Sequence, residues 1–121
     1  QADGGTRTAA ITGAWVALRI ATERMLLAGS ITRQPVRENV AAISCGIWQG
    51  MPVADLDYIE DSNAEIDANF VLSGNGGLVE IQATGEKRPF QRDEMDQLLD
   101  LAEASCKQLF TLQDGAVRAA L

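Results

Sequence analysis

The carboxylates of residues 55–67 are the most concentrated chemical feature of this sequence. Six Asp or Glu side chains fall within thirteen residues. Apolar and acidic residues alternate with a period of two, which is typical of half-buried strands, and residues 61–63 have the composition of a turn between them. The apolar face would hold Leu56, Tyr58, Ala64, Ile66, Ala68 and Phe70, and the acidic face would hold Asp55, Asp57, Asp61, Glu65 and Asp67. Crowded carboxylates repel one another, so a divalent metal, arginines or water must compensate them.

Asp61 and Asp67 flank the predicted turn, so a hairpin can bring both close enough to share one divalent cation. Oxygen ligands with water completing the shell favour Mg²⁺ or Mn²⁺. The simpler alternative is a solvated acidic sheet face, which is common. The sequence contains no histidine, which excludes Ser-His and Cys-His nucleophile pairs and ordinary zinc sites.

A second candidate site lies at the amino-terminal end, where Gly4, Gly5, Thr6, Arg7 and Thr8 precede a helical pattern. Glycines allow close approach of the backbone, and the amides at a helix start attract anions. Arg7 adds a guanidinium fork suited to phosphate, and the threonines add hydroxyl donors. Taken alone, the motif favours an ordinary capped helix with a surface arginine. Taken with the carboxylate pair, it indicates phosphoryl transfer.

Composition indicates one domain, because 121 residues with 46% hydrophobic content can form a single core. No apolar run reaches the length of a membrane span and no secretion signal is visible, so we expect a cytosolic protein in which Cys45 and Cys106 are buried free thiols. The net charge of −7 combines +3 in residues 1–37 with −10 in the remainder. This balance argues against the chain alone gripping a nucleic-acid backbone, although an anion can still bind at the basic end.

The elements expected from periodicity and turn residues form an α+β domain. We expect a helix from Ala9 to just before Gly29, four strands at 39–48, 52–60, 64–72 and 78–83, and a second helix that begins near Gln91 and bends or ends near Asp114 and Gly115. The short connections predict an antiparallel meander with both helices on one face of the sheet. The sequence starts at Gln1 on a turn, as expected for the middle of a longer protein.

The motifs closely resemble those of the ribonuclease PH enzymes. Residues 1–13 (QADGGTRTAAITG) are similar to the central segment of that family, and residues 55–62 (DLDYIEDS) and 64–67 (AEID) continue the likeness. Further similarity lies in residues 40–44 (VAAIS), 79–82 (VEIQ) and the last helix, so that the resemblance covers essentially all of the chain. It implies half of a ribonuclease PH-like domain, a fold also described as ribosomal protein S5 domain 2-like.

The resemblance implies a phosphate-dependent 3′-to-5′ exoribonuclease that trims transfer-RNA precursors and releases nucleoside diphosphates. In the family, the glycine-threonine-arginine turn binds inorganic phosphate, which carries over to Gly5, Thr6 and Arg7, with Thr8 adjacent. The paired aspartates required for catalysis and associated with the metal carry over to Asp61 and Asp67. Such enzymes form hexamers, as trimers of dimers. Phosphate is itself the nucleophile, so the absence of histidine is no obstacle.

Three positions depart from the family pattern: Ala68, Ala83 and Lys87. The larger departure is that the family's amino-terminal half, with a further phosphate-binding arginine, does not occur in these 121 residues. A fragment should expose sheet edges and apolar surface, and its activity would depend on the other half. Two alternatives remain: a non-catalytic RNA-binding or scaffold subunit of an exosome-like ring, and a generic magnesium-binding phosphotransfer domain.

Overall fold

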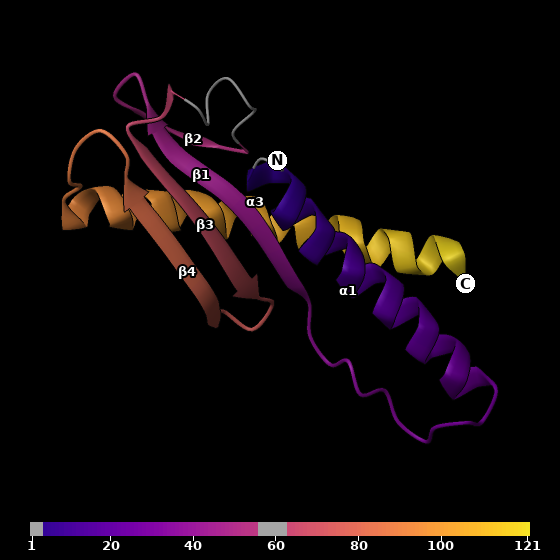
Figure 1. Cartoon of the computed structure of the whole chain (residues 1–121). Coiled ribbons are helices and arrows are strands. Elements are labelled where there is room, and N and C mark those ends of the chain that lie inside the picture. Colours follow the sequence, from indigo (N-terminus) through magenta and orange to yellow (C-terminus); the bar gives the residue numbers. More distant parts are fainter. Residues whose placement is uncertain (1–3, 56–62) are drawn as a thin grey trace.

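The computed structural model describes residues 4–55 and 63–121, and within them two long helices flank four strands (Figure 1). In chain order the elements are α1 (Gly4–Leu27), β1 (Val40–Trp48), β2 (Met51–Ala54), β3 (Ile66–Ser73), β4 (Leu78–Gly85) and α3 (Arg92–Ala120). The expected α+β class, a helix, four antiparallel strands and a helix, is confirmed. No helix in the described part of the chain has the length and apolar character needed to cross a membrane.

The sheet has the order β2-β1-β3-β4, with every neighbouring pair antiparallel. The meander that we expected, in which β2 would pair with β3, is therefore wrong. β1 is the longest strand and seven of its nine residues are buried, so it occupies the centre with a partner on each edge. β2 ends at Ala54, short of the predicted 52–60, because Asp55 has a positive φ of 59°. The rest of that predicted strand lies outside the described residues.

The hydrophobic core lies between α3 and one face of the sheet. Alternate residues of β1 and β3 point to this face, including Ile43, Cys45 and Phe70. Leu98 and Ala102 of α3 pack against them and are fully buried, with Cys106 one turn further on. The apolar stripe predicted for this helix is therefore confirmed. Because successive strand residues face opposite ways, the polar residues of β1 and β3 gather on the other face.

α1 lies along the edge of β1 that β2 leaves open, and it packs against the carboxy-terminal half of α3 (Figure 1). Thr12 satisfies backbone groups of β1 on that edge: its hydroxyl accepts a hydrogen bond from the Ala42 amide at 3.1 Å and donates one to the Ala42 carbonyl at 3.3 Å. Gln113 of α3 donates to the carbonyls of Thr12 and Val40. Of the two described helices, α3 covers a face of the sheet and α1 lies at its edge, so the expectation that both helices cover one face holds for α3 alone.

Both helices are longer than the pattern predicted. α1 begins at Gly4 rather than Ala9, and α3 continues through Asp114 and Gly115 to Ala120. Gly115 does not break α3 because buried Gln113 and Val117 on either side tie this part of the helix to the rest of the fold. α3 starts with a capping box in which Gln91 and Glu94 satisfy each other's backbone amides.

Candidate active site

The predicted phosphate-binding residues form the first two turns of α1, rather than a turn that precedes the helix. Thr8 is buried, and its hydroxyl donates to the Gly5 carbonyl at 3.2 Å, a bond within the helix. Thr6 and Arg7 are exposed. The amides of a first helical turn have no partner within the helix, so this end retains the capacity to bind an anion.

Arg7 forms an ion pair with Glu80 of β4, with 2.6 Å between the guanidinium Nη2 and the carboxylate Oε1. The two side chains are 44% and 38% exposed, so water screens the pair and it contributes little to stability. The contact nevertheless places the Arg7 guanidinium over the polar face of the sheet. A bound anion would have to compete with Glu80 for it.

Asp67 lies on this same polar face, in β3. It is paired across the sheet with Gly46 of β1 and Thr84 of β4. Glu80 is four residues before Thr84 on β4, so the position contacted by Arg7 is roughly 13 Å along the strand from the position beside Asp67. Arg7 and Asp67 are thus on one side of the sheet. Asp61 lies outside the described residues, so its pairing with Asp67 stays a prediction.

Two further polar side chains accompany Asp67, and the sequence reading missed them. Ser44 and Asn69 are cross-strand partners, and their Oγ and Oδ1 atoms are buried without a hydrogen-bond partner in the part of the chain that the structure describes. The Oδ1 atom of Asp67 is buried as well. The available signal was one serine in the otherwise apolar strand β1 and the alternation of Asp67 and Asn69 in β3. That Ser44 and Asn69 lie side by side is known only once the register of the strands is known.

This donor set fits a hard divalent cation, because its buried donor atoms are all oxygens. Asp67 and the predicted Asp61 would hold the ion. Among residues 4–55 and 63–121, no group of three or more acidic or cysteine side chains could hold a metal by itself.

A groove of about 400 Å³ adjoins the start of α1 and opens beside Asp55. Its walls come from the small residues on one side of α1 and from β1 and α3. They comprise Gly5, Thr8, Ala9, Thr12, Gly13, Ala42, Ile43, Asp55 and Leu109. A groove of this size with apolar walls can accept the flat face of a nucleotide base.

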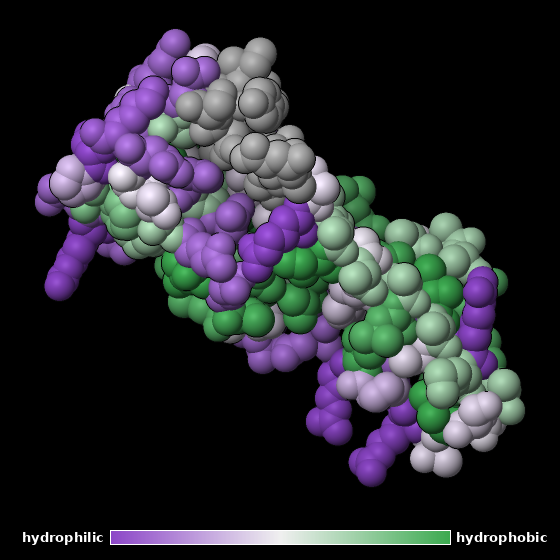
Figure 2. Space-filling model, in the orientation of Figure 1, coloured by the Kyte–Doolittle hydropathy of each residue, from purple (hydrophilic) through white to green (hydrophobic). Residues whose placement is uncertain are grey.

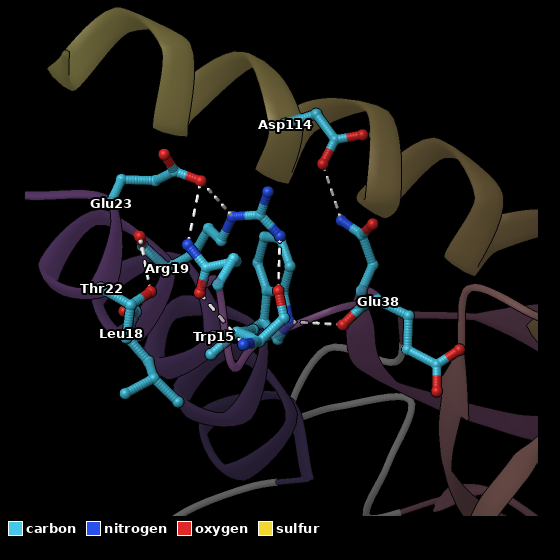
Figure 3. Close-up of polar contacts among 10 residues, drawn as sticks. Trp15, Leu18, Arg19, Thr22, Glu23, Glu38 and Asp114 are labelled. Atoms are coloured by element: carbon cyan, nitrogen blue, oxygen red, sulfur yellow. Dashed lines mark hydrogen bonds and ion pairs between the residues drawn. The ribbon is translucent and has the colours of Figure 1, made fainter. Parts of the chain in front are cut away.

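Arg19, another arginine at the basic end of the chain, is committed to the fold (Figure 3). Arg19 donates to the Glu23 carboxylate at 3.1 Å and to the Val36 carbonyl at 2.6 Å. Trp15 donates its indole N–H to the Glu38 carbonyl at 2.8 Å. These bonds hold the connection between α1 and β1 against the helix, so Arg19 is a structural residue and the candidate anion site at this end centres on Arg7.

The two cysteines belong to the core rather than to any site. Both are buried free thiols, as predicted. Burial raises the pKa of Cys45 to about 12 and that of Cys106 to about 11. Both thiols are therefore protonated and poorly nucleophilic at neutral pH.

Comparison with known proteins agrees with the fold and with the motifs. Residues 38–105, more than half of the chain, match the 3′ exoribonuclease family, domain 2. Ribonuclease PH of Caulobacter vibrioides is 62% identical over 117 residues, and that of Cereibacter sphaeroides is 56% identical over the same length. Ribonuclease PH of Methylobacterium radiotolerans is also 56% identical. Each match covers 97% of this chain but 49% of the relative, so the chain spans about half the length of these relatives.

A match over most of the chain, together with the helix, the four-stranded antiparallel sheet and the second helix, defines the relationship. The chain belongs to the 3′ exoribonuclease family and is homologous to the carboxy-terminal portion of ribonuclease PH.

Proposed function

We propose that this chain is the carboxy-terminal part of the catalytic domain of a phosphate-dependent 3′-to-5′ exoribonuclease that trims transfer-RNA precursors. Inorganic phosphate is the co-substrate and nucleoside diphosphates are the products. The observation that carries the proposal is that Arg7 and Asp67 lie on one side of the sheet, in a chain 62% identical to a ribonuclease PH over its matched length.

The chemistry requires positioning and charge compensation more than a strong base. The start of α1, with Gly5, Thr6, Arg7 and Thr8, holds inorganic phosphate, and an oxygen of that phosphate attacks the terminal phosphodiester. The bond from phosphorus to the 3′ oxygen of the preceding nucleotide breaks, and that oxygen takes up a proton. A divalent cation, Mg²⁺ or Mn²⁺, would neutralise charge that develops on the transferred phosphorus group. Asp61 and Asp67 would hold this cation.

The remaining parts of the proposal concern assembly. The family resemblance implies a ring of six copies, a trimer of dimers, that acts on RNA in the cytoplasm. An amino-terminal half of the same protein would supply the rest of the phosphate site and of the RNA path. The acidic balance of this chain, −7 overall, agrees with an RNA path that lies largely on other surfaces.

One observation favours a second candidate, a non-catalytic RNA-binding or scaffold subunit of a similar ring. The Arg7 guanidinium already forms an ion pair with Glu80, so phosphate would have to displace Glu80 in order to bind it. A scaffold subunit would still fold as this one does. The two candidates differ in whether phosphate and Asp67 matter for RNA shortening.

The decisive experiment grafts residues 1–121 in place of the matching segment of the Caulobacter ribonuclease PH and assays phosphate-dependent shortening of a transfer-RNA precursor. Asp67→Asn removes a charge and keeps the side-chain volume, so we expect activity to fall by about 100-fold or more. Asp96→Asn, an exposed change in α3, is the matched control. Nucleoside diphosphates identify phosphorolysis and exclude the generic phosphotransfer alternative.

Unchanged activity in the Asp67→Asn protein would remove Asp67 from the catalytic machinery. A graft that folds and assembles but releases no nucleoside diphosphates would favour the scaffold candidate.

A further inference from the structure

Glu65, two residues before Asp67, connects separate turns of the fold with its carboxylate. Its Oε1 atom accepts a hydrogen bond from the Gly50 amide at 3.0 Å, in the turn between β1 and β2. Its Oε2 atom accepts a bond from Arg88 Nε at 3.1 Å, in the connection between β4 and α3. The β1–β2 turn and the β4–α3 connection are therefore both bonded to Glu65, the residue immediately before β3.

The other edge of the Arg88 guanidinium binds Glu94, in the first turn of α3. Nη1 donates to Oε1 at 3.0 Å and Nη2 donates to Oε2 at 2.8 Å, a bidentate pair. Glu94 Oε1 also accepts from the Gln91 amide at 2.9 Å, as part of the capping box. The chain of bonds from Glu65 through Arg88 thus ends on the amino terminus of the long helix, which is anchored in the core.

The backbone of Glu65 is held as firmly as its side chain. Its amide donates to the Ile47 carbonyl at 2.8 Å, and its carbonyl accepts from the amides of Glu86 at 2.9 Å and Lys87 at 3.3 Å. Lys87 Nζ also donates to the Asn63 carbonyl at 3.1 Å. The entry to β3 is therefore fixed from β1 on one side and from the end of β4 on the other.

The bidentate contact between Arg88 and Glu94 shifts the pKa of both groups. The hydrogen bonds from Arg88 hold the pKa of Glu94 at about 2, below its ordinary value. The bonds to Glu94 and then to Glu65 raise the pKa of Arg88. Arg88 and Glu94 are both charged throughout the neutral range, so the bond between them does not depend on pH there.

We propose that Arg88, acting through Glu65, is a positioning residue that fixes the direction in which β3 presents the Asp67 carboxylate. This inference rests on the proposed function, because the orientation of Asp67 matters only if Asp67 takes part in catalysis. Successive strand residues alternate in direction, so a small rotation of the strand at Glu65 reorients Asp67 two residues later. A lysine keeps the charge of Arg88 but cannot bind both carboxylates with one planar fork.

The first test needs no metal. In the 121-residue chain, three-bond couplings measured by NMR report the χ1 rotamer of Asp67. We expect one rotamer in the parent chain and averaged couplings in both Arg88→Lys and Glu65→Gln. Arg92→Lys changes an exposed arginine nearby and is expected to leave the couplings unchanged. Unchanged Asp67 couplings in folded Arg88→Lys and Glu65→Gln proteins would overturn the proposal.

The second test is a Mn²⁺ titration of the same proteins, well below their melting temperatures. Loss of positioning should weaken Mn²⁺ binding by about tenfold in Arg88→Lys, the effect seen when groups behind a ligand are removed. Arg88→Met separates this from simple electrostatics: removing a nearby positive charge would tighten Mn²⁺ binding, whereas loss of positioning weakens it. Tighter binding in Arg88→Met with unchanged binding in Arg88→Lys contradicts the proposal.

The two proposals fail in different ways. If Asp67→Asn binds Mn²⁺ as the parent chain does, the metal role in the proposed function is wrong, and the rotamer measurement still decides the role of Arg88. If Asp67→Asn abolishes Mn²⁺ binding while Arg88→Lys changes neither the rotamer nor the affinity, the metal role stands and the positioning role is wrong.

Discussion

Arg7 has two competing anionic partners: Glu80, which it contacts, and the phosphate that we propose it binds. Glu80→Gln should therefore lower the apparent Michaelis constant for phosphate in the grafted enzyme, by up to about fivefold, because an exposed ion pair is worth about 0.2–1 kcal/mol. Arg7→Ala should raise that constant about tenfold by removing a charge-assisted donor. Steady-state assays at varied phosphate concentration measure both.

The control for this pair is Glu86→Gln, which removes one negative charge from an exposed residue that has no side-chain partner in the described part of the chain. A Michaelis constant that falls equally in Glu86→Gln would indicate a general charge effect rather than release of Arg7. An unaltered constant in Arg7→Ala would remove Arg7 from the phosphate site.

Candidate site residues can be named from the sequence where the chemistry requires a particular residue type. The motif around Arg7 and the aspartate at position 67 stand out because few residue types can bind phosphate or a divalent cation, and their roles stay predictions. Ser44 and Asn69 were not predicted, because the sequence does not show that a serine in one strand lies opposite an asparagine in another. Glu65 was interpreted as one more acidic residue, since its partner Arg88 is 23 residues further along the chain.

Glycines illustrate how element geometry decides the effect of a substitution. Gly115 lies inside α3, and a methyl group added there would meet open space. Gly115→Ala should raise the free energy of unfolding by about 0.5–1 kcal/mol, since alanine loses less backbone entropy in a helix. A methyl group on Gly85 would collide with the backbone carbonyl of Arg88, so Gly85→Ala should lower the free energy of unfolding by about 1–3 kcal/mol.

Urea denaturation of both variants checks this pair, because the two changes are chemically identical and only their surroundings differ. Equal effects of the same sign would show that the tight turn at the end of β4 relaxes without cost. Such relaxation would also weaken the argument that this turn holds the entry to β3 rigid.

The elements themselves follow from the sequence to different degrees. The stripe of α3 was predicted because its apolar residues recur at helical spacing on one side, with fully buried Leu98, Ala102 and Cys106 at its centre. The order of the strands was not predicted. A period of two indicates which face a residue occupies but not which strand lies beside it, so a hairpin between β2 and β3 looked as good as the observed pairing of β1 with both.

As a whole, the molecule leaves apolar surface uncovered, as expected for a chain that matches half the length of its relatives. Figure 2 shows apolar residues along the outer side of α1, where Leu18 is 54% and Met25 44% exposed. The helix has the composition of a buried element but a free outer face in this chain.

β4 is an edge strand whose Leu78, Val79 and Ile81 side chains are 53%, 60% and 43% exposed. An apolar edge is a template for pairing with a second copy, so we expect the 121-residue chain to self-associate as its concentration rises. Val79→Lys places a charge on that edge and should shift the sedimentation-velocity distribution toward monomer. Leu112→Lys changes an equally exposed apolar residue on α3, 67% exposed, and should have little effect. If Leu112→Lys disperses the chain and Val79→Lys does not, association runs through the helical surface, and the edge of β4 is not its cause.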